Sequence, residues 1–164
     1  MQRTLLICRH AETYDPYPLQ PDFERELTPN GHLQATRTGQ WIRDKFSRVD
    51  TLLASPARRA NDTARTIAKR LYFDEEKISY LPGLYNAREG DLLRCLAALP
   101  QHAKAVLLVA HNPGITRLAR DLSGTHIGYL EPGKVVAVKL EFEVWSDIYT
   151  ATGTLLDDNT KQLS

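Results

Sequence analysis

The sequence has few cysteines and no long apolar segment. Cys8 and Cys95 are the only two cysteines among 164 residues. A disulfide framework is therefore not expected, and both are interpreted as buried, reduced thiols. Only four apolar residues in a row precede Arg9, too few for a signal peptide, and no run approaches the length of a transmembrane helix. These absences predict a cytoplasmic protein with no membrane partner.

The chain also lacks an excess of charge of either sign. Lys and Arg number 21, Asp and Glu number 20, and the formal net charge is +1. No global basic field therefore favours nucleic acid. The length fits a single domain, 1–164, in which about 156–164 is expected to be a polar tail. The proline-rich, polar segment from Tyr14 to Glu26 is interpreted as a long functional loop.

Short apolar runs alternate with segments whose apolar residues recur at helical spacing. The expected strands are Arg3 to Cys8, Thr51 to Ala54, Ile78 to Leu81 and Ala105 to Ala110. Continuous apolar runs are typical of parallel strands that are buried on both faces. The pattern predicts an α/β fold, a three-layer α/β/α sandwich with a mainly parallel central sheet.

The end of the chain has a different pattern. Apolar and charged residues alternate from Val138 to Val144, which predicts a half-exposed antiparallel edge strand with Ile148 to Leu155 as its hairpin partner. Among the helices, Leu92 to Ala97 marks one that ends near Pro100.

Three helices are expected to begin where a capping residue precedes a proline. These dipeptides are Thr28-Pro29, Ser55-Pro56 and Asn112-Pro113. A threonine, serine or asparagine side chain accepts a hydrogen bond from the first turn of a helix, and proline is tolerated there. Thr28, Ser55 and Asn112 are therefore predicted to be N-caps.

Basic side chains follow two of the expected parallel strands. Arg9 and His10 come directly after the first strand, and His111 follows another. Open α/β sheets bind ligands at the carboxyl ends of their strands, so two imidazoles and a guanidinium are expected side by side. The helix after the second strand carries Arg58 and Arg59 in its first turns, where either can bind phosphate oxygens in a bidentate way.

Such a site suits chemistry on a phosphoryl group. Positive charge and helix N-termini stabilise the oxygens of a transferring phosphoryl group. An imidazole with an unprotonated nitrogen can attack phosphorus and form a covalent intermediate. If one of His10 and His111 is a neutral nucleophile while the other is charged or donates a hydrogen bond, their surroundings must separate their pKa values. Glu12 is the acidic residue expected nearby.

Two other kinds of site would use the same residues. No two histidines are spaced for one helix face and no cysteine joins them, so no metal or other cofactor is expected. Ser55 lacks the Gly-x-Ser-x-Gly context of a serine hydrolase and is better explained as a cap. His32, His102 and His126 lie in polar contexts and are interpreted as surface residues.

Three segments resemble the signatures of the histidine phosphatase superfamily, which has the phosphoglycerate mutase-like fold. They are Arg9-His10-Ala11, Ser55 to Ala64 and Ala110 to Pro113, and they occur in the order of the family. The resemblance spans residues 1 to about 155. Arg25 to Gly31 and Leu84 to Ala87 are similar to the small bacterial phosphohistidine phosphatases of the SixA type.

The resemblance implies a metal-independent phosphatase that forms a covalent intermediate. His10 corresponds to the nucleophile, which is transiently phosphorylated. Arg9, Arg59 and His111 correspond to residues of the phosphate pocket, and Arg59 matches the family's arginine better than Arg58 does. Asn112 is expected to line the same pocket.

Two departures from the family pattern bear on the substrate. Ala11 stands where a glycine commonly follows the nucleophile, and the segment from Leu84 to Gly90 offers only Glu89 as a proton donor, at an unconvincing position. Glu12 is kept as a candidate donor. Phosphohistidine expels an imidazole, which leaves more readily than an alkoxide, so a pocket without a placed acid favours that substrate.

The expected partner is therefore a protein that carries phosphohistidine. Tyr14, Tyr17 and Phe23 in the long loop are candidate contacts with such a protein. Two alternatives stay open, a phosphatase for small phosphoesters and a phosphoprotein-binding module that has lost turnover. Both alternatives would use the same phosphate pocket.

Overall fold

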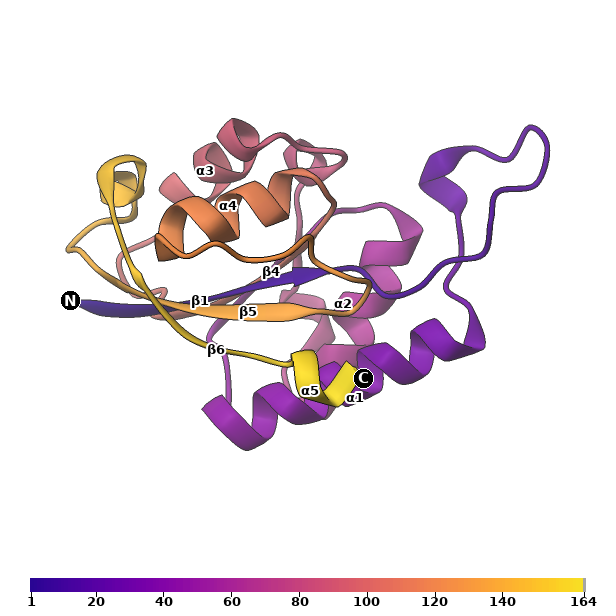
Figure 1. Ribbon diagram of the computed structural model, residues 1–164, viewed down its shortest axis with the longest axis horizontal. Helices are drawn as coiled ribbons and strands as arrows, with labels where there is room; N and C mark the ends of the chain where they lie inside the picture. Colours follow the sequence, from indigo (N-terminus) through magenta and orange to yellow (C-terminus); the bar gives the residue numbers. More distant parts are fainter. Residues whose placement is uncertain (164) are drawn as a thin grey trace.

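The computed structural model describes residues 1–163, which form a six-stranded sheet between two layers of helices (Figure 1). The strands are β1 (Gln2–Arg9), β2 (Thr51–Ala54), β3 (Ser79–Tyr80), β4 (Ala105–Ala110), β5 (Val135–Glu141) and β6 (Thr154–Asp158). The helices are α1 (Pro29–Phe46), α2 (Arg58–Arg70), α3 (Glu89–Ala97), α4 (Gly114–Ser123) and the short α5 (Thr160–Leu163). No helix among these residues is long and apolar enough to cross a bilayer.

The sheet has the order β3-β2-β4-β1-β5-β6. The first four strands in this order pair in parallel, β5 pairs antiparallel with β1, and β6 pairs antiparallel with β5. Helices α1 and α2 lie on one face of the sheet and α3 and α4 on the other (Figure 1). The predicted three-layer α/β fold with a mainly parallel sheet is confirmed.

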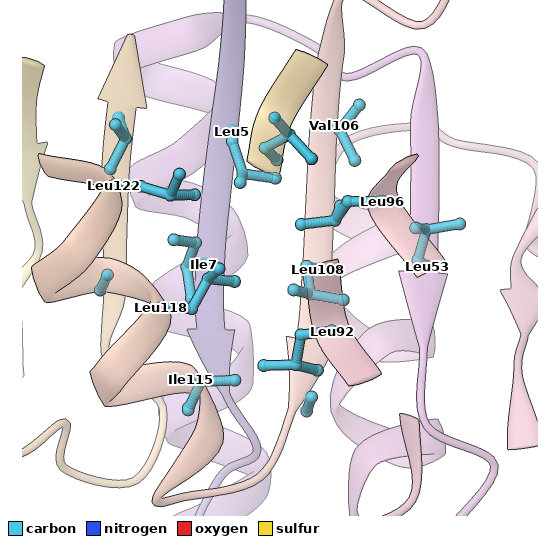
Figure 2. Close-up of a cluster of buried hydrophobic side chains, with 14 of the residues drawn as sticks. Leu5, Ile7, Leu53, Leu92, Leu96, Val106, Leu108, Ile115, Leu118 and Leu122 are labelled. Carbon is cyan, nitrogen blue, oxygen red and sulfur yellow. The ribbon is translucent and has the colours of Figure 1, made fainter. Parts of the chain in front are cut away.

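Alternation along the strands divides the core between the two faces. Leu5 and Ile7 of β1 belong to the cluster under α3 and α4, together with Leu108 of β4 (Figure 2). Leu6 and Cys8 lie in the cluster with apolar residues of α1 and α2. Successive side chains point to opposite faces of a strand, so an unbroken apolar run fills both clusters.

The register of the central strands places the ends of β1, β2 and β4 together. Arg9 pairs with Ala110, so the residues that follow them, His10 and His111, leave neighbouring strands at the same edge of the sheet. The main-chain N–H of Ser55, just after β2, donates to the carbonyl of Val109 at 3.0 Å. The sheet therefore brings three distant segments to one end.

Only one of the three predicted helix caps is found. Thr28 accepts a hydrogen bond from the N–H of Gly31 at the start of α1. The Ser55 and Asn112 predictions are wrong, because α2 begins at Arg58 and α4 at Gly114 without a side-chain cap. Tertiary partners hold these two side chains instead, His111 for Ser55 and the carbonyl of Leu130 for Asn112.

The C-terminal predictions also need correction. The predicted alternation of buried and exposed residues holds from Val138 to Glu141, but β5 starts at Val135 and is not an edge strand, because β6 pairs with it. Of the predicted hairpin partner, Ile148 to Leu155, the first three residues belong to a 3-10 helix, Trp145–Thr150. The strand that does return antiparallel to β5 is β6, which starts only at Thr154. Residues 156–163, expected within the polar tail, complete β6 and form α5 beside α1. Ser164 lies outside the described residues.

The two cysteines differ in exposure. Cys8 is buried, and burial raises the pKa of its thiol to about 12. The prediction of a buried thiol is wrong for Cys95, which lies on α3 and is only partly buried where it packs against the core cluster. Both are free thiols.

Candidate active site

The two imidazoles after β1 and β4 meet in one pocket. The ring centroids of His10 and His111 are 5.4 Å apart and the rings are tilted by 54°. The pocket has a volume of about 270 Å³. Its walls come from six segments and comprise Arg9, His10, Thr13, Asp22, Arg25, Arg59, Asn86, His111, Asn112 and Tyr129. The structure thus brings together His10, Arg9, Arg59, His111 and Asn112, as the sequence suggested.

His10 is held in one tautomer by the main chain. Its Nδ1 lies 2.8 Å from the carbonyl oxygen of Ala11. A carbonyl only accepts hydrogen bonds, so Nδ1 carries the ring proton and Nε2 keeps a free lone pair. Burial, reinforced by the charges of Arg59 and Arg9, lowers the pKa of His10 to about 4 despite this hydrogen bond. The ring is therefore neutral and nucleophilic at neutral pH.

His111 has a different partner. Its Nε2 lies 2.8 Å from the hydroxyl oxygen of Ser55, which also accepts the N–H of Ala57. Its Nδ1 is buried and has no hydrogen-bond partner within residues 1–163. An oxygen of a bound phosphoryl group can therefore complete the hydrogen bonding of this ring.

Both imidazoles are uncharged at neutral pH. Burial is the main cause of a lowered pKa of about 3 for His111, and the nearby Arg59 and His10 add to it. The two pKa values therefore shift in the same direction. The free site therefore does not combine one charged and one neutral histidine. The positive charge of the pocket comes from its arginines alone.

The two neighbouring arginines of α2 have different surroundings. Arg59 is 4% exposed and lines the pocket. Arg58 points outward, where it forms an exposed salt bridge with Glu26 at 2.9 Å and a longer one with Asp62. Of these two arginines, only Arg59 lines the pocket.

Arg9 and Asn112 are both tied to the segment before β5. Arg9 donates to the carbonyl of Leu130, and its guanidinium lies 5.8 Å from the ring centre of Tyr129. The amide of Asn112 donates to the same carbonyl, and its oxygen accepts from Thr116. Asn112 therefore lines the pocket without capping α4, because its side chain joins two tertiary contacts.

The carboxylate in the pocket is Asp22, not Glu12. Glu12 accepts hydrogen bonds from Thr28 and Asn30 and does not line the pocket. It ties the segment after His10 to the start of α1. Asp22 is not predicted as a site residue from the sequence, because it lies in the middle of the long loop. The one sequence feature that pointed to it was the interpretation of that loop as functional.

Asp22 belongs to a short 3-10 helix, Asp22–Glu24, and is the residue of that helix that lines the pocket. Its Oδ2 accepts from Tyr85 at 2.7 Å and from Arg59 at 3.0 Å. Partial burial opposes ionisation, but these hydrogen bonds and the charge of Arg59 outweigh it and lower the pKa of Asp22 to about 2. Asp22 is thus a permanent anion at neutral pH.

Aromatic contacts fix this part of the loop. The ring of Phe23 meets that of Tyr85 edge-on at 5.2 Å, and Tyr85 meets His111 at 5.8 Å. Tyr14 and Tyr17 stay exposed at 52% and 64%. The part of the loop around Asp22 and Phe23 is therefore anchored to the site, whereas Tyr14 and Tyr17 face solvent.

Glu89 lies outside the pocket, at the start of α3. Partial burial and a shared hydrogen bond with Asp121 raise its pKa to about 7. Within residues 1–163, no three histidine, cysteine, aspartate or glutamate side chains are grouped so that they could hold a metal ion. The titratable side chains that line the pocket are two imidazoles, three guanidiniums, the carboxylate of Asp22 and the phenol of Tyr129.

Comparison with known proteins gives consistent similarities. A family model described as the histidine phosphatase superfamily (branch 1) matches residues 5–92, more than half of the chain. A structure from Nakamurella multipartitia, described as a proposed phosphohistidine phosphatase SixA, has 26% identity and a TM-score of 0.83, covering 96% of this chain and 95% of that one. An uncharacterised Mycobacterium tuberculosis protein is 27% identical over 157 residues, 90% of this chain and 96% of that protein.

A third similarity concerns the fold alone. The structure of a protein histidine phosphatase SixA in complex with tungstate has 22% identity and a TM-score of 0.80. The alignment covers 94% of this chain and 95% of that chain. The same arrangement of helices and strands therefore occurs in a protein of that description.

Proposed function

Because the chain belongs to the histidine phosphatase superfamily and is a phosphatase, we propose that it removes the phosphoryl group from phosphohistidine in a protein, with His10 as the nucleophile. In the first step the lone pair on Nε2 of His10 attacks phosphorus. The P–N bond of the substrate breaks, and its electron pair stays on the departing imidazole nitrogen. The phosphoryl group is then bonded to His10.

Water completes the reaction. It attacks phosphorus on phosphorylated His10, the second P–N bond breaks, and inorganic phosphate leaves. Arg9 and Arg59 stabilise the negative charge on the phosphoryl oxygens in both steps. Neutral His111, with its unpartnered Nδ1, adds a polar contact to the same oxygens.

One observation supports this substrate above all others. Among the described residues that line the pocket, the carboxyl group is Asp22, and its pKa of about 2 leaves it without a proton to give. An alkoxide leaving group needs a proton donor much more than an imidazole does. The pocket is therefore suited to a phosphoramidate.

The shape of the site supports a protein substrate. The pocket holds about 270 Å³, enough for a phosphoryl group and one side chain, and Asp22 and Arg25 of the Tyr14 to Glu26 loop line it. A phosphohistidine side chain can reach such a site from outside. The buried free thiol of Cys8 is consistent with a cytoplasmic location for this activity.

Rapid quench with a radiolabelled phosphohistidine protein tests the proposal. We expect inorganic phosphate to be released and an acid-labile label to appear on the wild-type enzyme. His10→Ala should abolish both while its circular dichroism spectrum stays unchanged. Rapid hydrolysis of sugar phosphates with little of phosphohistidine would support the small-phosphoester alternative instead. Tight binding without label or release would indicate a binding module.

A further inference from the structure

The carboxylate of Asp22 is held rigidly at the mouth of the phosphate pocket. Its Oδ2 takes hydrogen bonds from Tyr85 and Arg59, and its Oδ1 lies 3.5 Å from a guanidinium nitrogen of Arg25. Arg59 also donates to the main-chain carbonyl of Asp22, at 2.8 Å. Two arginines and a tyrosine therefore set the position of this one anion.

Exposure shows on which side of the bound phosphoryl group Asp22 lies. The floor is buried, with His10 at 7% and His111 at 3% exposure. The Asp22 side chain is 45% exposed. Because the phosphoryl group must reach His10 on the floor, the group that departs has to lie toward the open mouth, beside Asp22.

The charges of the pocket match those of a phosphoryl dianion. Arg9, Arg25 and Arg59 provide three positive charges, and Asp22 removes one of them. The two that remain balance a bound phosphoryl dianion. A further negative charge on the leaving group would then face Asp22 with no cation to compensate it, whereas a neutral or cationic leaving group would not be repelled.

We propose that Asp22 determines specificity by selecting a neutral or cationic leaving group and disfavouring a carboxylate beside the phosphohistidine. This inference rests on the proposed function. When the phosphohistidine ring is protonated on its distal nitrogen, the P–N bond breaks with its electron pair returning to the ring. The proton stays on the distal nitrogen, and a neutral imidazole departs without a proton from the enzyme. The carboxylate of Asp22 favours that protonated ring.

Two phosphohistidine peptides that differ only in a Lys or Glu next to the phosphohistidine test this role. For the wild-type enzyme we expect kcat/KM to be about tenfold higher for the Lys peptide, the effect of one nearby charge at a partly exposed site. Asp22→Asn should bring the ratio of the two kcat/KM values close to one. Raising the salt concentration should reduce the wild-type ratio, because exposed charges are screened.

Glu24→Gln is the matched control. Glu24 lies in the same 3-10 helix, is exposed and does not line the pocket, and its substitution changes the net charge equally. It should leave the ratio unchanged. If Asp22 only positioned Arg59, Asp22→Asn would lower kcat/KM for both peptides by the same factor, and that result would overturn the proposal.

The wild-type enzyme separates the two proposals even if Asp22→Asn fails to fold. Hydrolysis of neither peptide would refute the proposed function. Hydrolysis of both with equal kcat/KM would refute the role of Asp22 and leave the proposed function standing.

Discussion

The Nε2 atom of His111 lies 2.8 Å from the hydroxyl oxygen of Ser55. The two residues follow neighbouring strands, β4 and β2, and the sheet register brings them together. Ser55 was expected to cap a helix, yet its side chain fixes the orientation of an imidazole in the pocket. A serine after the second strand thus supports the site without touching the reacting phosphorus.

Ser55→Ala should lower activity more than its small change in volume suggests. Loss of the hydroxyl leaves a buried imidazole nitrogen unpaired, which costs about 1–3 kcal/mol of stability. We expect kcat to fall about tenfold or more, since outer partners of this kind orient the groups that act. Steady-state kinetics and urea unfolding measure the two effects. An unchanged kcat would show that His111 needs no such support.

Arg59→Ala and Arg58→Ala form a matched pair on one helix. Arg59→Ala should raise the barrier by about 2.7–4 kcal/mol, the typical effect of removing one preorganised donor. Arg58→Ala breaks only exposed salt bridges and should change the barrier and the stability by less than about 1 kcal/mol. Measurement of kcat/KM for both variants decides the point, and a larger loss for Arg58→Ala would contradict the placement of these side chains.

Stability should fall as the pH drops from 7 to 5. In the unfolded chain a histidine binds its proton near pH 6.5, whereas folded His10 and His111 stay neutral down to about pH 4 and about pH 3. The unfolded state therefore binds more protons in this interval, which favours unfolding by about 2 kcal/mol for each imidazole.

Urea unfolding at both pH values measures this loss. His10→Gln and His111→Gln should each reduce the difference between pH 7 and pH 5, and the double variant should reduce it further. In NMR spectra both rings should be less than about one tenth protonated at pH 5.5. Half-protonation of either ring near pH 6.5 would be inconsistent with the burial of the site.

Gly31→Ala should impair the enzyme although the residue is outside the pocket. A Cβ at Gly31 would lie 2.1 Å from the carbonyl oxygen of Glu12, and so would push away the main chain two residues after His10. We expect losses of both activity and stability, the latter of roughly 1–3 kcal/mol. Gly90→Ala in α3 is the control: its Cβ would have no neighbour within 4 Å, and alanine should stabilise that helix by about 0.5–1 kcal/mol. Equal effects of the two substitutions would argue against the close packing of Gly31.

Removal of metal ions should not change the rate. Arg9 and Arg59 supply the positive charge that a metal would otherwise provide to the phosphoryl oxygens. Activity before and after dialysis against EDTA tests this expectation, and restoration of a lost rate by an added divalent cation would contradict it.

Vanadate should inhibit competitively, because it mimics the phosphoryl group in transfer.

Local sequence patterns predicted those features of the structure that depend on a single segment of the chain. The continuous apolar runs before Arg9 and His111 identified two buried parallel strands, and strand ends of that kind meet at one edge. The Thr28 cap was also predictable, because its partner Gly31 lies within the same turn. Ser55 and Asn112 carry equally good capping signals, but a neighbouring strand and the segment at Leu130 provided stronger partners for them.

The sequence by itself determined the α/β/α layers and the residues at the strand ends, because both depend on the period of the apolar pattern. Only the tertiary structure decided that Asp22 joins Arg59, that both imidazoles are neutral, and that the C-terminal residues extend the sheet. The physical reason is that a loop's path, the burial of a charge and the pairing of an edge strand depend on contacts between distant segments. No local pattern records those contacts.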